Sequence, residues 1–61
     1  MDYVALGKNI RKYRLAKGLR QIDLAAKTNY SDSYIGQIEN NRTTPSLEAI
    51  VAIANVLEVT V

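Results

Sequence analysis

The sequence contains neither cysteine nor histidine. Without cysteine the chain has no disulfide framework and no thiolate site for zinc or an iron–sulfur cluster. Without histidine it lacks the commonest metal ligand and the commonest general base. It also has no glycine-rich phosphate loop and no cluster of carboxylates. We therefore expect no enzyme activity, no metal site and no cofactor.

Long apolar segments are missing as well. The longest apolar stretch, residues 49–59, contains Asn55 and Glu58 and is too short to span a bilayer. Residues 1–6 include Asp2 and have no apolar run of the kind that a signal peptide needs. The sequence therefore predicts a soluble, intracellular protein with no membrane partner.

The chain is short, and its charge is unevenly distributed. Its 61 residues leave room for one domain, residues 1–61, and folds of this size without staples tend to be compact and helical. Residues 1–27 carry seven Lys and Arg against two Asp, a net +5, whereas residues 28–61 carry one Arg against four Asp and Glu, a net −3. This asymmetry fits a basic face for a polyanion or a solvated helix surface, and charge alone leaves both open.

Turn residues and apolar spacing predict a first helix over residues 3–17 and a second that begins at residue 20 or 21 and ends at 27 or 28. Asp2 caps the first, and Gly18 ends it in the left-handed conformation. The side chains expected to face inward are Leu6, Ile10 and Tyr13 in the first helix, and Leu24 and Ala25 in the second.

A tight connection over residues 28–31 follows, in which Asn29 suits a positive φ. Ser31 is the expected N-cap of a third helix over residues 32–40, which Asn41 closes, and Ser46 caps a fourth. The expected inward side chains are Ile35 and Ile38 in the third helix, and Leu47, Ile50, Ile53, Ala54 and Leu57 in the fourth. Residues 58–61 receive no assignment.

Residues 21–40 thus form two short helices joined by a tight turn, the geometry with which a helix enters the DNA major groove. Together with their surroundings they resemble the phage repressor and Cro type of helix-turn-helix domain, also called the XRE type. The resemblance covers about residues 5–58. The matching pieces are Leu6-Gly7-Lys8-Asn9-Ile10-Arg11, Arg14, Lys17-Gly18-Leu19-Arg20-Gln21, Asp23-Leu24-Ala25, Ile35, Ile38-Glu39-Asn40, Pro45-Ser46-Leu47 and Ala54.

The resemblance implies an all-α fold, a compact bundle of four to five short helices like that of lambda repressor. It implies a sequence-specific regulator of transcription, a repressor, that binds double-stranded operator DNA in the cytoplasm of a prokaryote, or encoded by a phage. It further implies a homodimer on a palindromic site. Many relatives begin a fifth helix where residues 59–61 lie, so the chain is expected to be truncated or one domain of a longer repressor.

The resemblance also assigns roles outside the third helix. In similar domains the residue at Gln21 binds backbone phosphate and braces the third helix, and an amide both donates and accepts hydrogen bonds. Asn40 and Arg42 lie at positions that contact phosphate. Arg14 and Glu39 correspond to a partly buried ion pair between the first and third helices. Arg14 and Arg20 are further phosphate candidates, although Arg20 replaces the usual Ser or Thr cap.

The third helix is expected to present Asp32, Ser33, Tyr34 and Gln37 to the bases. Gln37 lies about one turn beyond Asp32 and Ser33, and a glutamine amide pairs bidentately with adenine. A carboxylate at Asp32 is repelled by phosphate unless it accepts from a cytosine amine, so the favoured role is a charge at the helix N-terminus. For Ser33 and Tyr34 a merely solvated position stays open.

Two further expectations concern partners. Ala52, Val56 and Val59 form a second apolar stripe on the fourth helix, which predicts that it contributes to a homodimer. The alternatives to DNA reading are a protein-interaction module with the same fold and the antitoxin of a toxin–antitoxin pair, which binds both DNA and a partner protein.

Overall fold

The computed structural model describes residues 2–59, which form four helices and no strand. The helices are α1 (Tyr3–Ala16), α2 (Gln21–Thr28), α3 (Asp32–Glu39) and α4 (Leu47–Leu57). The predicted all-α bundle is confirmed, and the helix ends differ from the prediction by a residue or so. Thr60 and Val61, in the predicted start of a fifth helix, lie outside the described residues. Over residues 2–59, no helix has the length and apolar character needed to cross a membrane.

Three side chains cap helices as the sequence predicts. Asp2 Oδ1 accepts the Val4 N–H at 3.0 Å, Ser31 Oγ accepts the Tyr34 N–H at 3.0 Å, and Ser46 Oγ accepts the Ala49 N–H at 3.1 Å. Each cap satisfies a backbone donor that has no partner inside its own helix. The helices therefore begin where short polar side chains stand in the sequence.

A residue with left-handed φ follows the C-terminal end of each of the four helices. Gly18, Asn29 and Asn41 have φ values of 71°, 65° and 57°, as the sequence predicts for these positions. Glu58, at the end of α4, has a φ of 60° and carries no such signal in its residue type. Its carboxylate accepts from Lys17 Nζ at 2.6 Å, so the ends of α1 and α4 are tied together at this point.

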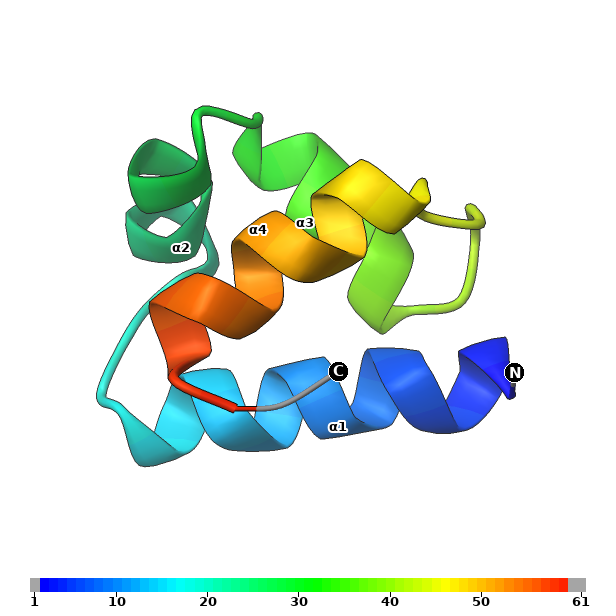
Figure 1. The fold of residues 1–61 in the computed structure, drawn as a ribbon, viewed down its shortest axis with the longest axis horizontal. Helices are drawn as coiled ribbons and strands as arrows, with labels where there is room; N and C mark the ends of the chain where they lie inside the picture. The colour runs from blue at the N-terminus through cyan, green and yellow to red at the C-terminus, as the bar shows by residue number, and fades with distance from the viewer. Residues whose placement is uncertain (1, 60–61) are drawn as a thin grey trace.

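All four helices contribute to one apolar core. In Figure 1, α1 runs along the bottom of the molecule, α2 and α3 lie above it, and α4 crosses the centre of the view. The largest fully buried side chains come from α2, α3 and α4, and they are Leu24, Ile35, Ile38 and Ile53. Burial of this apolar surface, rather than the helix propensity of eight-residue segments, stabilises α2 and α3.

Two of the predicted core residues, Leu47 and Tyr13, are exposed, and Leu6 is half-buried. Leu47 is 69% exposed because it is the first residue of α4, and the core side of the helix begins at Ala49 and Ile50. Tyr13 is 42% exposed and stands at the rim of a hollow between α1 and α4 rather than inside the core. Helical spacing predicts the inner side for Leu47 and Tyr13. Spacing does not show over which part of a helix that side meets the core.

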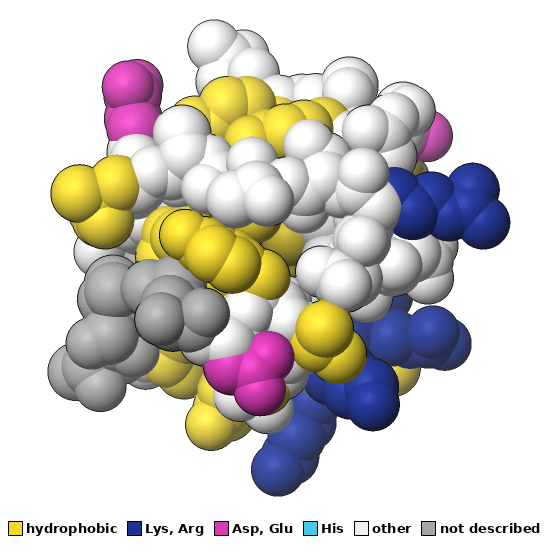
Figure 2. All heavy atoms as spheres, turned by 90° about the vertical axis from the view of Figure 1, so that its right-hand side faces the viewer, with side chains coloured by type: hydrophobic (Ala, Val, Ile, Leu, Met, Phe, Trp, Pro, Cys, Tyr) yellow, Lys and Arg dark blue, Asp and Glu magenta, His cyan; other side chains and the backbone are white. Residues whose placement is uncertain are grey.

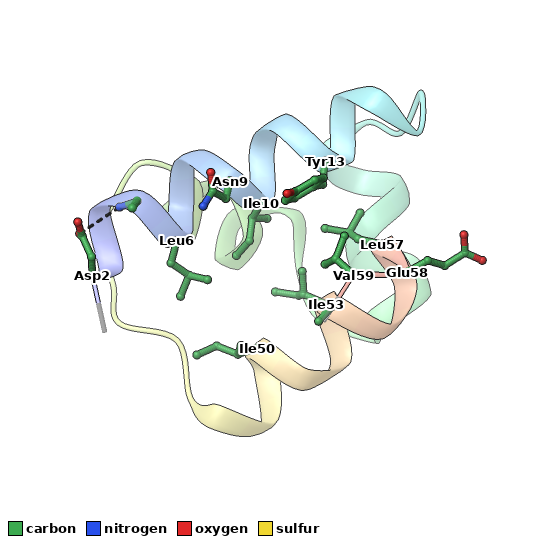
Figure 3. Close-up of a pocket in the computed structure, with 12 residues that line it drawn as sticks. Asp2, Leu6, Asn9, Ile10, Tyr13, Ile50, Ile53, Leu57, Glu58 and Val59 are labelled. Carbon is green, nitrogen blue, oxygen red and sulfur yellow. Dashed lines mark hydrogen bonds between the residues drawn. The ribbon is translucent and has the colours of Figure 1, made fainter. Parts of the chain in front are cut away.

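The hollow between α1 and α4 is lined mainly by apolar side chains. Leu6 and Ile10 enter it from α1 and Ile50, Ile53 and Leu57 from α4, with Val59 closing one end (Figure 3). The second stripe predicted on α4 is not exposed as expected. Ala52, Val56 and Val59 are half-buried, and Val56 and Val59 pack against the core. The stripe is therefore only partly exposed, and its contribution to a homodimer stays a prediction.

Candidate nucleic-acid interface

The two eight-residue helices α2 and α3 pack against each other through a short connection. Asn29 turns the chain in the left-handed conformation, and the Tyr30 N–H donates to the Ala25 carbonyl at 3.0 Å. Ile35 and Ile38 of α3 are buried, whereas Asp32, Ser33 and Gln37 are exposed. The buried face fixes α3 on the core and leaves one polar face turned outward.

Side-chain hydrogen bonds connect the exposed residues of α3 to one another. Gln37 Nε2 donates to Ser33 Oγ at 3.3 Å, and Asp32 Oδ1 accepts the Ser33 N–H at 3.0 Å. The Asp32 carboxylate therefore interacts with the N-terminal end of its own helix, where a negative charge is favourable. Within residues 2–59, Gln37 Oε1 and its second N–H have no partner, and these are the acceptor and donor that an adenine edge requires.

Tyr34 lies apart from this exposed group. Its side chain is half-buried and packs against the core, and its ring centroid lies 5.2 Å from that of Tyr30 with the planes tilted by 55°. Such a tilted pair is a favourable aromatic arrangement. The ring therefore stabilises the connection between α2 and α3, and a DNA contact by Tyr34 would involve only the part of the side chain that stays exposed.

A buried ion pair links α1 to the end of α3. Arg14 Nε donates to Glu39 Oε2 at 2.7 Å and Arg14 Nη2 to Glu39 Oε1 at 3.0 Å, a bidentate arrangement. The two residues are only 6% and 7% exposed. The hydrogen bond that Arg14 donates to the Glu39 carboxylate raises the pKa of Arg14, so the guanidinium stays charged. Little of the guanidinium is left for the phosphate contact expected of Arg14.

Gln21 extends this pair to α2. Its Nε2 donates to Glu39 Oε1 at 3.2 Å, and Arg14 Nη1 also donates to the Leu19 carbonyl at 2.8 Å, just before α2 begins. One carboxylate therefore connects α1, α2 and α3 through charge-assisted hydrogen bonds. Gln21 is the first residue of α2, so its backbone N–H has no partner within the helix and remains suited to an anion.

Arg20 pairs with Asp23 instead of capping α2. Arg20 Nε and Nη2 donate to the two Asp23 carboxylate oxygens, each at 3.0 Å, and the Arg20 backbone N–H donates to Asp23 Oδ2 at 2.8 Å. A guanidinium cannot accept a hydrogen bond, so Arg20 caps no N–H of the first turn, and Asp23 instead satisfies the Arg20 backbone N–H. The phosphate contact expected of Arg20 has to compete with this pair.

Asp23 should control part of the acid stability of the domain. The side-chain hydrogen bond from Arg20, with the backbone N–H, lowers the pKa of Asp23 from its ordinary value of 3.8 to about 2. Below pH 4 the unfolded chain therefore binds a proton more readily than the folded one, and this contribution to stability is lost as the pH falls from about 4 to 2. We expect NMR titration to give a pKa near 2, and Arg20→Ala to raise it toward the ordinary value. An unchanged pKa in Arg20→Ala would contradict the assigned cause.

Asn40 and Arg42 follow directly after α3. The Asn40 N–H donates to the Gly36 carbonyl at 3.0 Å, and the Arg42 N–H donates to the Gln37 carbonyl at 2.8 Å, so both backbones are held against the last turn of α3. Both side chains are exposed, and neither has a hydrogen-bond partner within residues 2–59. The predicted phosphate ligands therefore stand at the C-terminal end of α3, with Gln21 at the start of α2.

The predicted Arg14–Glu39 pair is present, whereas sequence reasoning missed two other side-chain contacts of the site. The Ser33–Gln37 hydrogen bond follows from an i,i+4 spacing that is visible in the sequence. Arg20 and Asp23 have the i,i+3 spacing of a surface ion pair, which is equally visible in the sequence.

Among residues 2–59 no three carboxylates lie close enough together to hold a metal ion.

Comparison with known proteins decides the family. The Helix-turn-helix family model matches residues 10–61. The chain belongs to the helix-turn-helix family. The immunity repressor of Bacillus phage phi105 is 38% identical over 58 residues, which are 95% of this chain and 40% of the repressor. The chain thus spans less than half the length of this helix-turn-helix relative.

Solved helix-turn-helix structures agree with the fold. The restriction-modification controller protein C.AhdI from Aeromonas hydrophila superposes with a TM-score of 0.91 at 36% identity, over 97% of this chain and 89% of that one. The biofilm regulator SinR in complex with DNA gives a TM-score of 0.83, also at 36% identity, over 88% of this chain and 87% of that one. Identity at this level together with these TM-scores makes the helix arrangement common to all three chains.

Proposed function

We propose that this chain is the DNA-binding part of a transcriptional repressor and that it inserts α3 into the major groove of double-stranded DNA. The observation that carries the proposal is the polar face of α3, where Asp32, Ser33 and Gln37 are exposed on a helix held by a buried ion pair. Pre-positioned side chains on a rigid element are what base readout requires. The likeness to SinR, solved with DNA, supports the same function.

Phosphate contacts position the helix, and base contacts select the sequence. In the proposed complex the start of α2, with Gln21, binds one phosphate, and Asn40 and Arg42 bind others beyond the C-terminal end of α3. Gln37 reads a base, with Ser33 beside it. The Asp32 carboxylate keeps its place at the N-terminus of α3 and makes no phosphate contact.

Two single variants separate these roles. Gln37→Ala should reduce the preference for the cognate base at one operator position by about 1–3 kcal/mol, or about 5–150-fold, without changing the salt dependence of binding. Arg42→Ala should weaken binding to all sequences alike and lower the slope of log K against log salt by about 1. Selection from a randomised duplex pool, followed by anisotropy titrations at several salt concentrations, measures both quantities.

The outcomes are interpretable in both directions. Gln37→Ala with an unchanged base preference would remove Gln37 from the reading face. Arg42→Ala with an unchanged salt slope would show that its guanidinium makes no phosphate contact. If the unmodified chain selects no sequence and shows no salt-dependent binding, the proposed function is wrong.

The remaining features of the regulator are proposals that follow from the family. They are a single domain over residues 1–61, a place in the cytoplasm of a prokaryote and a homodimer on a palindromic operator. The similar length and fold of the controller protein support a domain of this size. The stripe of Ala52, Val56 and Val59 is half-buried, and its contribution to that homodimer is part of the same proposal.

A further inference from the structure

The lysine and arginine side chains of α1 divide into two groups. Arg14 and Lys17 are paired with Glu39 and Glu58. The other three are exposed and take part in no salt bridge among residues 2–59, and they are Lys8, Arg11 and Lys12. Exposed cations without carboxylate partners repel one another and attract polyanions. Whether these three cations can reach DNA bound by α3 therefore depends on where they lie relative to that helix.

Gly7 fixes that position. A Cβ atom at Gly7 would lie 2.5 Å from the Ile38 carbonyl oxygen and 3.1 Å from that of Glu39, so α1 touches the last turn of α3 here. Arg11 lies one helical turn beyond Gly7 on the same face, and Arg14, three residues later, reaches Glu39. Arg11 therefore stands at the margin of the α1–α3 contact. Lys8, three residues before Arg11, is its surface neighbour.

Arg42 lies at the same end of α3, because its backbone N–H is bonded to the Gln37 carbonyl. Figure 2 views the molecule from the side where α1 begins and α3 runs into the α3–α4 loop. On this face the lysine and arginine side chains gather along one edge. The exposed cations Lys8, Arg11 and Arg42 thus all stand on segments that meet the last turn of α3.

We propose that Lys8 and Arg11 form a second phosphate-binding site, which extends the DNA contact from the C-terminal end of α3 onto α1. The inference rests on the proposed function. With α3 in the groove, the phosphates that border the groove at the C-terminal end of α3 face this edge, and an exposed guanidinium with a neighbouring ammonium is suited to bind them. These contacts add affinity and orientation without sequence preference.

The competing explanation is a purely structural role. Cations near the C-terminal end of α3 also interact favourably with the dipole of that helix. The two explanations differ in salt dependence. Each phosphate contact contributes about 0.9 to the slope of log K against log salt, whereas a helix-dipole interaction contributes nothing to DNA binding. The double variant Lys8→Gln/Arg11→Gln should therefore lower the slope by about 1.8 if both cations bind phosphate.

Lys27→Gln provides the matched control. Lys27 is also exposed and free of salt bridges within residues 2–59, but it lies beside Lys17, Leu19 and Val56, at the C-terminal ends of α1 and α4. The test is a salt series of anisotropy titrations with a random-sequence duplex, with thermal melts to confirm that each variant is folded. The expected result is a smaller slope in the double variant and an unchanged slope in Lys27→Gln.

Two results would overturn the inference alone. One is a double variant that is folded and has the slope of the unmodified chain. The other is a loss of slope in Lys27→Gln that equals, per charge removed, the loss in the double variant, which would reduce the effect to net charge. Absence of salt-dependent binding by the unmodified chain would overturn the proposed function as well. A loss of base selectivity in the double variant would show that these cations do more than bind phosphate, and would also contradict the proposal.

Discussion

Glu39→Ala should lower the free energy of unfolding by about 3–5 kcal/mol, because it leaves the Arg14 guanidinium buried with only the Leu19 carbonyl as a partner. Gln21 Nε2 loses its acceptor at the same time. A domain with a total stability of about 5–15 kcal/mol would lose much of its folded population at elevated temperature. Urea unfolding followed by circular dichroism measures the change.

Two controls show whether the buried charge is the cause. Lys17→Ala breaks the exposed pair with Glu58 and should cost no more than about 1 kcal/mol. The double variant Arg14→Met/Glu39→Leu removes both charges and should be more stable than Glu39→Ala, since no charge is left buried alone. A Glu39→Ala protein within 1 kcal/mol of the unmodified chain would contradict the assigned role of the pair.

Gly7→Ala should destabilise the domain by about 1–3 kcal/mol or more. Alanine normally improves a helix interior by about 1 kcal/mol over glycine, so the expected sign is the reverse of the helix-propensity effect. The cause is the α3 backbone: the new methyl would lie 2.5 Å from the Ile38 carbonyl oxygen, and a carbonyl inside a helix cannot move away cheaply. Thermal or urea unfolding gives the difference.

Gly36→Ala is the matched substitution. A methyl at Gly36, in the middle of α3, would meet only the flexible Gln21 side chain, with Oε1 at 3.3 Å. We therefore expect Gly36→Ala to be tolerated. If Gly7→Ala proved as stable as Gly36→Ala, α1 would not approach α3 as closely as described, and the placement of Arg11 beside α3 would fail with it.

Local signals in the sequence predicted the elements well. Ser31 and Ser46 cap helices, and Asn29 and Asn41 adopt positive φ, because these effects depend on a few neighbouring residues. Helical spacing also identified Ile35, Ile38 and Ile53 as core residues. Spacing alone could not show that Leu47 stands before the point where α4 meets the core.

Prediction of the site depended more on contacts between helices than prediction of the helices themselves did. The resemblance to a family, rather than spacing, placed Arg14 opposite Glu39, 25 residues apart in the chain. The closeness of Gly7 to the α3 backbone has no local signal in the sequence. Polar residues on an exposed helix face and their partners one turn away can be predicted from the pattern, but partners on another helix cannot.

The central claim is that α3, together with the start of α2 and the loop after α3, forms the DNA-binding surface. The most direct test is an NMR titration of the isotope-labelled chain with a duplex, which maps amide shift changes onto the structure. The account predicts the largest changes at Gln21, over residues 32–37 and over residues 40–42, with little change along the buried side of α4. Changes concentrated in the hollow between α1 and α4, or no changes at low salt, would contradict it.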